Sequence, residues 1–325
     1  MEPATLVFWT LNILVWIGVV AGVVLWLLWA VKWFALGRRT PLLESDPEAK
    51  PFWEWSDFLI MIGSFIIAYV LAAYAFAGTP SPNSLRQSVP AEQVAKPEID
   101  AVLAKQSEHA VDSTKQRNQY RRAIVLHTFA SFSAILLTLV WLQASYRRPL
   151  SAFGLGVTFA DVRRGLIAAV WILSPVLLIS SLVSWLVPYR HLLLDTMASD
   201  PTWDSFALLL VSAVIVTPVA EELAFRMLLQ GGLQTLANRM LSNHSDPKPR
   251  SVMIFTSWAP ILASSVFFAL MHLGQGAAPI PLFVFSIGLG YVYRQTGRLA
   301  IPILIHFVLN LSTLCVEFSR ISAGL

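Results

Sequence analysis

The chain contains a series of uncharged apolar stretches, each long enough to cross a lipid bilayer as a helix. A crossing takes about 20 apolar residues, because roughly 30 Å of hydrocarbon must be covered at about 1.5 Å per residue. Four stretches in the first part of the chain meet this length, at residues 5–31, 58–77, 123–146 and 166–189. Among Asp, Glu, Lys, Arg and His, they contain only His127. The sequence therefore predicts four membrane-spanning helices in this part.

The C-terminal part contains four further candidate spans, at residues 205–236, 252–273, 279–293 and 299–316. The first of these is interrupted by charged residues, and the third is short and rich in glycine. We therefore expect an all-α, polytopic transmembrane helical bundle of about eight spans, surrounded by the lipid bilayer. Residues 1–204 are predicted to form an N-terminal transmembrane region of about four spans, and residues 205–325 are predicted to form a C-terminal core of about four spans. The long polar connection at 78–122 is expected to be a loop with some amphipathic helix.

The composition agrees with a membrane protein and excludes several other classes. Of the 325 residues, 56% are apolar and 13% are charged, whereas a soluble domain carries about a quarter of its residues charged. The single Cys315 cannot form an internal disulfide or a Cys-x-x-Cys metal pair. The net charge is only +4, and no basic stripe is interleaved with aromatics, so we expect no nucleic-acid partner.

The distribution of basic residues predicts the orientation in the membrane. Short connections that are rich in Lys and Arg tend to stay in the cytoplasm. Every second connection carries such residues. The connection after the third span, for example, contains Arg147, Arg148, Arg163 and Arg164. Eight spans with both termini outside satisfy this pattern. We therefore expect a multi-pass protein of the plasma (inner) membrane, with its active site toward the cytoplasm.

The fifth span carries ionisable side chains where a membrane helix rarely tolerates them. Each costs about 2.5 to 3.5 kcal/mol inside the bilayer, so such residues are candidates for function. Glu222 and Arg226 are four residues apart and share one helix face, whereas Glu221 is turned about 100° away. Glu222 is then expected to pair with Arg226, and Glu221 to remain unpaired. Pro218 removes a backbone hydrogen bond just before them, which requires protein or a wet cavity to satisfy the carbonyl.

Two later spans also present polar faces in apolar sequence. Phe268 and His272 share a face in the sixth span, and His306 and Asn310 share one in the eighth. Buried polar groups need partners, so we expect the three faces to converge on one hydrated cavity. For His272 to reach Glu221, the sixth helix must begin deeper in the membrane, near Pro260, or be tilted.

With these motifs in this order, the chain resembles the CPBP (Abi) family of intramembrane proteases. This family includes the type II CAAX prenyl endopeptidases and the bacterial lysostaphin-resistance and bacteriocin-processing proteins. The resemblance covers residues 205–316 and lies in three motifs, Glu-Glu-x-x-x-Arg, Phe-x-x-x-His and His-x-x-x-Asn. The residues that match are Glu221, Glu222, Arg226, Phe268, His272, His306 and Asn310.

The resemblance implies an activity and a role for each residue. Glu221 and His272 would activate a water molecule, while His306 and Asn310 would stabilise the oxyanion of the tetrahedral intermediate. Glu222, Arg226 and Phe268 would support them. The implied enzyme is an intramembrane endopeptidase that hydrolyses a peptide bond of a membrane-associated peptide or protein, with prenylated substrates among the candidates.

Other chemistries remain open at the level of the sequence. Glu221, His272 and His306 could instead ligate a divalent metal such as zinc, although the glutamate mechanism does not require one. The same residues could form a relay in a transporter or proton-coupled carrier, although no inverted repeat is visible. They could also be retained in a catalytically silent membrane scaffold.

His127 in the third span belongs to none of these motifs. A single histidine in an apolar span is more often a hydrogen-bonded packing residue than a functional one. We therefore expect His127 to make a structural hydrogen bond.

Overall fold

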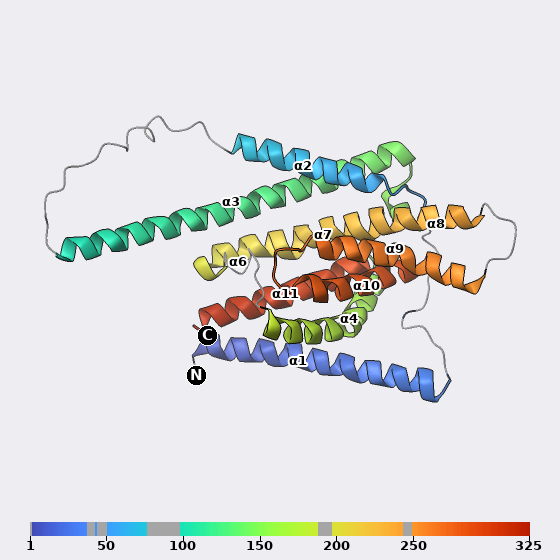
Figure 1. The fold of residues 1–325 in the computed structure, drawn as a ribbon, viewed down its shortest axis with the longest axis horizontal. Coiled ribbons are helices and arrows are strands. Elements are labelled where there is room, and N and C mark those ends of the chain that lie inside the picture. Colours follow the sequence, from blue (N-terminus) through green and yellow to red (C-terminus); the bar gives the residue numbers. More distant parts are fainter. Residues whose placement is uncertain (1, 38–42, 44–50, 77–97, 188–196, 243–248) are drawn as a thin grey trace.

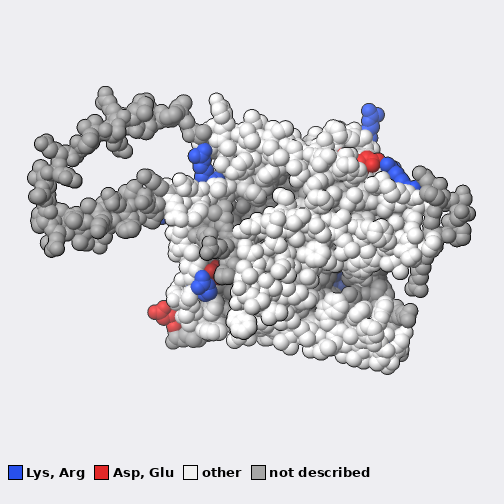
Figure 2. All heavy atoms as spheres, in the orientation of Figure 1, with Lys and Arg blue, Asp and Glu red and all other residues white. Residues whose placement is uncertain are grey.

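The computed structural model describes residues 2–37, 43, 51–76, 98–187, 197–242 and 249–325, and these residues form helices without any β-strand. Within them, seven helices are long and apolar enough to cross a membrane. The helices run roughly along the long axis of the molecule, with both termini at the same end (Figure 1). On the face in Figure 2, charged side chains gather toward the two ends and leave an almost uncharged band between them. The predicted all-α membrane bundle is confirmed.

The first helix is packed into the bundle by a close approach of backbones. Helix α1 (Pro3–Ala30), prolonged by the wide turn η1 (Val31–Ala35), lies against α4 (Phe159–Leu186) and α11 (Ala300–Ser322). The Trp26 indole donates a hydrogen bond of 2.8 Å to the carbonyl of Trp171 in α4. A Cβ on Gly22 would lie 1.8 Å from the hydroxyl oxygen of Ser174. Glycine at this position lets the two helices meet.

Helices α2 (Asp57–Ala75) and α3 (Glu98–Tyr146) form a pair along one edge of the bundle (Figure 1). The buried carboxylate of Asp57 ties them together, because it accepts hydrogen bonds from Tyr146 Oη at 2.6 Å and Trp141 Nε1 at 2.9 Å. Helix α3 begins well before the predicted third span, so the polar connection is helical from Glu98 onward. Residues 77–97 of that connection lie outside the described residues.

The fifth predicted span is one continuous helical segment in the middle of the bundle. It consists of α6 (Trp203–Leu209), η4 (Leu210–Val216), α7 (Thr217–Glu222), η5 (Leu223–Gly231) and α8 (Gly232–Ser242), where η marks wider π-helical turns. We call this segment the motif helix. Parts of it pack against α2, α3, α11, α9 (Arg250–Leu270) and α10 (Pro279–Thr296). Its central position explains why so many of its side chains are buried.

The last three helices correspond to the last three predicted spans, with two differences. Helix α10 is not among the seven apolar helices, because glycines and the polar residues Arg294 and Gln295 interrupt its apolar sequence. Two of its apolar side chains, Phe285 and Leu289, are fully buried between the neighbouring helices. For His272 to reach Glu221, we expected α9 either to begin near Pro260 or to be tilted. Helix α9 does not begin near Pro260; it begins at Arg250 and contains Pro260 within it.

The contact between α1 and α4 gives a test of the fold with a matched control in the same helix. Gly22→Ala is expected to lower the free energy of unfolding by about 1–3 kcal/mol, because the added methyl group overlaps the Ser174 hydroxyl. Gly18→Ala is the control, since nothing lies within 4 Å of a Cβ at that position. Thermal unfolding in detergent measures both. Equal unfolding temperatures for the two variants would contradict this packing.

Candidate functional site

The motif helix changes its winding on both sides of the predicted site. The α-helical turn that ends in Glu221 and Glu222 lies between the π-helical segments η4 and η5. π-Helical turns are rare and occur frequently at functional sites, because they displace side chains from regular helical positions. The backbone of this helix is therefore irregular where the sequence places its two carboxylates.

Glu222 and Arg226 form the ion pair that their spacing predicts. Arg226 Nε lies 3.0 Å from Glu222 Oε2, and both side chains are completely buried. Arg226 Nη1 also donates to the Ser264 hydroxyl at 3.4 Å, which in turn donates to the Phe225 carbonyl at 2.6 Å. The guanidinium carbon lies 5.1 Å from the centre of the Phe268 ring. This arrangement compensates a cation inside an apolar core.

His306 of α11 lies between the two carboxylates. Its Nδ1 is 2.9 Å from Glu222 Oε1, and its Nε2 is 3.7 Å from Glu221 Oε2. Because the carboxylate of Glu222 is paired with Arg226 and can only accept, Nδ1 is the donor. The rings of Phe285 at 5.2 Å and Phe268 at 6.1 Å enclose the imidazole. His306 therefore has one fixed nitrogen and presents the other to Glu221.

Glu221 differs from its neighbour in both exposure and pairing. Its side chain is 24% exposed, whereas that of Glu222 is fully buried. Within the described part of the chain, its nearest charged or ionisable partner is His306, and no hydrogen bond to the carboxylate is formed. The predicted separation of roles, a paired Glu222 and an open Glu221, thus agrees with the geometry.

Asn310 compensates for the proline in the motif helix. In η4 the Thr217 N–H bonds to the Ser212 carbonyl five residues earlier, so the next bond in this register would join residue 218 to the Ala213 carbonyl. Pro218 has no N–H and leaves that carbonyl without a backbone donor. The Asn310 side chain supplies one, with Nδ2 at 2.8 Å from the Ala213 oxygen. The predicted need for a group to satisfy this backbone is met from α11.

His272 is placed differently from the other motif residues. It lies just after the end of α9, is half-buried, and its Nδ1 is 2.8 Å from the carbonyl of Phe268. The centre of its ring is 4.8 Å from that of Phe268. Among the described residues, it forms neither a hydrogen bond nor an ion pair with Glu221. The structure therefore connects His272 to the site through Phe268 rather than directly.

The arrangement does not support the metal-binding alternative. Among the described residues, no group of three or more His, Cys, Asp and Glu side chains is placed to hold a metal ion. Glu221 and His306 are neighbours, but His272 does not join them as a third ligand. Nδ1 of His306 could not bind a metal while it donates its hydrogen bond to Glu222.

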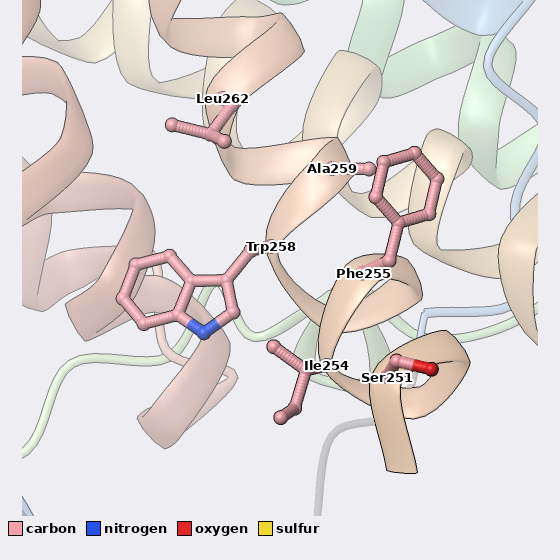
Figure 3. Close-up of a pocket in the computed structure, with 6 residues that line it drawn as sticks. All are labelled: Ser251, Ile254, Phe255, Trp258, Ala259 and Leu262. Atoms are coloured by element: carbon pink, nitrogen blue, oxygen red, sulfur yellow. The ribbon is translucent and has the colours of Figure 1, made fainter. Parts of the chain in front are cut away.

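A surface hollow elsewhere on the molecule is unrelated to these residues. It has a volume of about 420 Å³ and is lined by Ser251, Ile254, Phe255, Trp258, Ala259 and Leu262 of α9 (Figure 3). Its walls are almost entirely apolar and lack any predicted site residue. A hollow of this composition in a membrane-spanning helix suits lipid chains.

Sequence reasoning did not identify Ser264 or the Ala213 carbonyl as parts of the site. Ser264 lies four residues before Phe268 and so shares its helix face, which is a signal that could have indicated it. For the Ala213 carbonyl, the only indication in the sequence is its position a few residues before Pro218. Both gain their role from contacts with other helices.

Comparison with known proteins agrees with the motifs. Residues 202–312 match the family described as type II CAAX prenyl endopeptidase Rce1-like. The matched segment includes the motif helix residues Glu221 and Glu222 as well as His272, His306 and Asn310. No curated protein and no solved structure matches the chain significantly. Over residues 202–312, the chain is therefore similar to the type II CAAX prenyl endopeptidase Rce1-like family.

Proposed function

We propose that this protein is a CAAX-type intramembrane endopeptidase in which Glu221 activates the water that attacks a peptide bond. The observation that carries the proposal is the difference between the two adjacent glutamates. Glu222 is buried and held by Arg226 and His306, whereas Glu221 is partly exposed and lies 3.7 Å from His306 Nε2. A general base must be accessible and close to a proton-transfer partner, and of the two glutamates only Glu221 meets both needs.

The proposed reaction follows from the groups around Glu221. Its carboxylate removes a proton from water, and the resulting hydroxide attacks the carbonyl carbon of the scissile peptide. The oxyanion forms within reach of His306 and Asn310, which act as hydrogen-bond donors. The C–N bond then breaks, and the proton taken by Glu221 passes to the leaving amine. Donors fixed in advance stabilise the oxyanion without reorganisation, and each contributes about 10² to 10³ in rate.

Asn310 can serve this chemistry while it supports the backbone. A side-chain amide has two N–H donors, and only one of them is used by the Ala213 carbonyl. The second is available for an oxyanion. His306 donates from Nδ1 to Glu222, so its other ring nitrogen, Nε2, is the one that would have to carry a proton to donate to the oxyanion.

The surroundings of the site support a membrane-associated substrate. The motif helix is one of the seven helices that can cross the membrane, so Glu221 lies within a membrane segment. A hydrophobic peptide segment would enter from the lipid, and a prenyl group on the substrate would remain in the apolar phase. The basic connections support an opening toward the cytoplasm, and in this proposal the membrane is the plasma (inner) membrane.

Replacing Glu221 tests the proposed base. Glu221→Gln is expected to lower kcat/KM for a fluorogenic CAAX peptide by about 10² to 10⁴, because glutamine cannot accept the proton from water. Glu317→Gln is the control, since Glu317 pairs with Arg320 near the C-terminal end of α11. Purified protein in detergent is used for both. Undiminished cleavage by the Glu221 variant would discard the assignment.

The adjacent glutamate is expected to behave in the opposite way. Glu222→Gln should lower the free energy of unfolding by about 3 kcal/mol, because it leaves the Arg226 guanidinium buried without its counter-charge. Glu221→Gln should leave the unfolding temperature nearly unchanged. Thermal unfolding in detergent compares them, and the double variant Glu222→Gln with Arg226→Met should recover part of the loss. Equal destabilisation by both single variants would refute the separate roles.

A double-mutant cycle isolates the structural role of Asn310. Asn310→Ala leaves the Ala213 carbonyl without a donor and should cost about 1–3 kcal/mol of stability. In a Pro218→Ala background, the new backbone N–H can reach that carbonyl, so the same replacement should cost less. Unfolding temperatures of the four proteins measure the coupling. An equal loss in both backgrounds would show that Asn310 does not compensate for the proline.

A further inference from the structure

The N-terminal region reaches the motif helix through Trp53 rather than through His127. Among the described residues His127 forms no hydrogen bond, so the predicted structural bond is wrong, and its ring contacts that of Phe65 with centres 5.5 Å apart. Trp53 lies just before α2, where tryptophans of membrane proteins commonly sit at the lipid interface. Trp53 is instead only 1% exposed, and its indole N–H donates a 2.7 Å hydrogen bond to the Met227 carbonyl in η5.

The Met227 carbonyl needs this donor because the hydrogen-bond register of the motif helix changes there. In the π-helical segment η5, each N–H bonds to the carbonyl five residues earlier, so its last N–H points to residue 226. Gly232, the first residue after η5, bonds no further back than the Leu228 carbonyl, four residues earlier. The change of register passes over the Met227 carbonyl. A buried carbonyl without a partner is costly inside a membrane, and the Trp53 indole supplies the missing donor.

Two consecutive glycines at the end of η5 make room for the segment that carries Trp53. A Cβ on Gly231 would lie 2.8 Å from the Trp53 ring, and a Cβ on Gly232 would lie 2.4 Å from the backbone of Trp55. On its other side the indole packs against the Phe153 ring, with centres 5.4 Å apart. The indole is thus held between the motif helix and Phe153, with its N–H directed at one carbonyl.

We propose that Trp53 is a positioning residue of the site, because its hydrogen bond holds the register of η5 and with it the place of Arg226. Arg226 directly precedes the carbonyl that Trp53 binds, and its Nε lies 3.0 Å from the Glu222 carboxylate. Glu222 in turn accepts the hydrogen bond of His306, whose other nitrogen lies 3.7 Å from Glu221. The inference rests on the proposed function, because it assigns a positioning residue to the same reaction.

Hydrogen exchange tests the backbone contact without enzymatic activity. Trp53 is replaced by benzothienylalanine, which keeps the two fused rings but carries sulfur in place of the N–H. Exchange of the η5 amides should become about tenfold faster, because an unsatisfied carbonyl makes local opening easier. The same replacement at Trp26, whose indole donates to the Trp171 carbonyl in α4, is the control and should leave η5 unchanged. Unchanged η5 exchange in the Trp53 variant would overturn the proposal.

Kinetics separate a positioning role from a purely structural one. With kcat expressed per folded protein, the Trp53 variant should lower kcat for the CAAX peptide about tenfold and leave KM nearly unchanged, because a small displacement of the reacting groups slows chemistry more than binding. The Trp26 variant should change neither. An unaltered kcat together with faster η5 exchange would show that Trp53 supports only the fold, and a loss confined to KM would equally overturn the positioning role.

Gly231→Ala approaches the same contact from the motif helix. Its methyl group would displace the Trp53 ring, so it should reproduce both the faster η5 exchange and the lower kcat. Gly63→Ala in α2 controls for the higher helix propensity of alanine, since nothing lies within 4 Å of a Cβ at that position. Unaltered exchange and kcat in Gly231→Ala would contradict the proposal. If the unmodified protein cleaves no peptide, the proposed function fails, while the exchange results still decide whether Trp53 holds η5.

Discussion

The buried ion pair between Glu222 and Arg226 is the interaction on which the site depends. Two charges inside an apolar bundle are stable only if they are paired and hydrogen-bonded. Here Ser264, Phe268 and His306 add contacts to the pair, although Nη2 of Arg226 is buried without a hydrogen-bond partner. The pair joins the motif helix to α9 and α11 at one point. Because the pair gives Glu222 a structural role, Glu221 remains the unpaired, partly exposed carboxylate of the motif.

A second constraint comes from the backbone of the motif helix. Pro218 and the π-helical turns around it break the regular hydrogen-bond pattern, and a membrane offers little water to repair the loss. Asn310 provides the repair from a neighbouring helix. A side chain that the family resemblance assigns to oxyanion stabilisation therefore also holds the helix that carries the carboxylates. The irregular backbone and the site residues depend on each other.

The N-terminal half of the chain takes part in this arrangement even though it carries no motif. Trp53 is almost fully buried and donates a 2.7 Å hydrogen bond to the Met227 carbonyl in η5. Phe58 of α2 contacts Phe225 of the same segment. The division of the chain at residue 204 stays a prediction, but helices from both sides of it surround the motif helix. Substitutions far from the motifs can therefore move the site.

The sequence by itself determined the features that depend on local spacing. Uncharged runs of about 20 residues indicated the spans, and the four-residue spacing paired Glu222 with Arg226, because bilayer thickness and helical pitch are fixed. Only the tertiary structure decided which groups meet across helices. His306 reaches Glu222 over 84 positions and Trp53 reaches Met227 over 174, and such contacts depend on how helices pack. For the same reason His272 lies on Phe268 instead of Glu221.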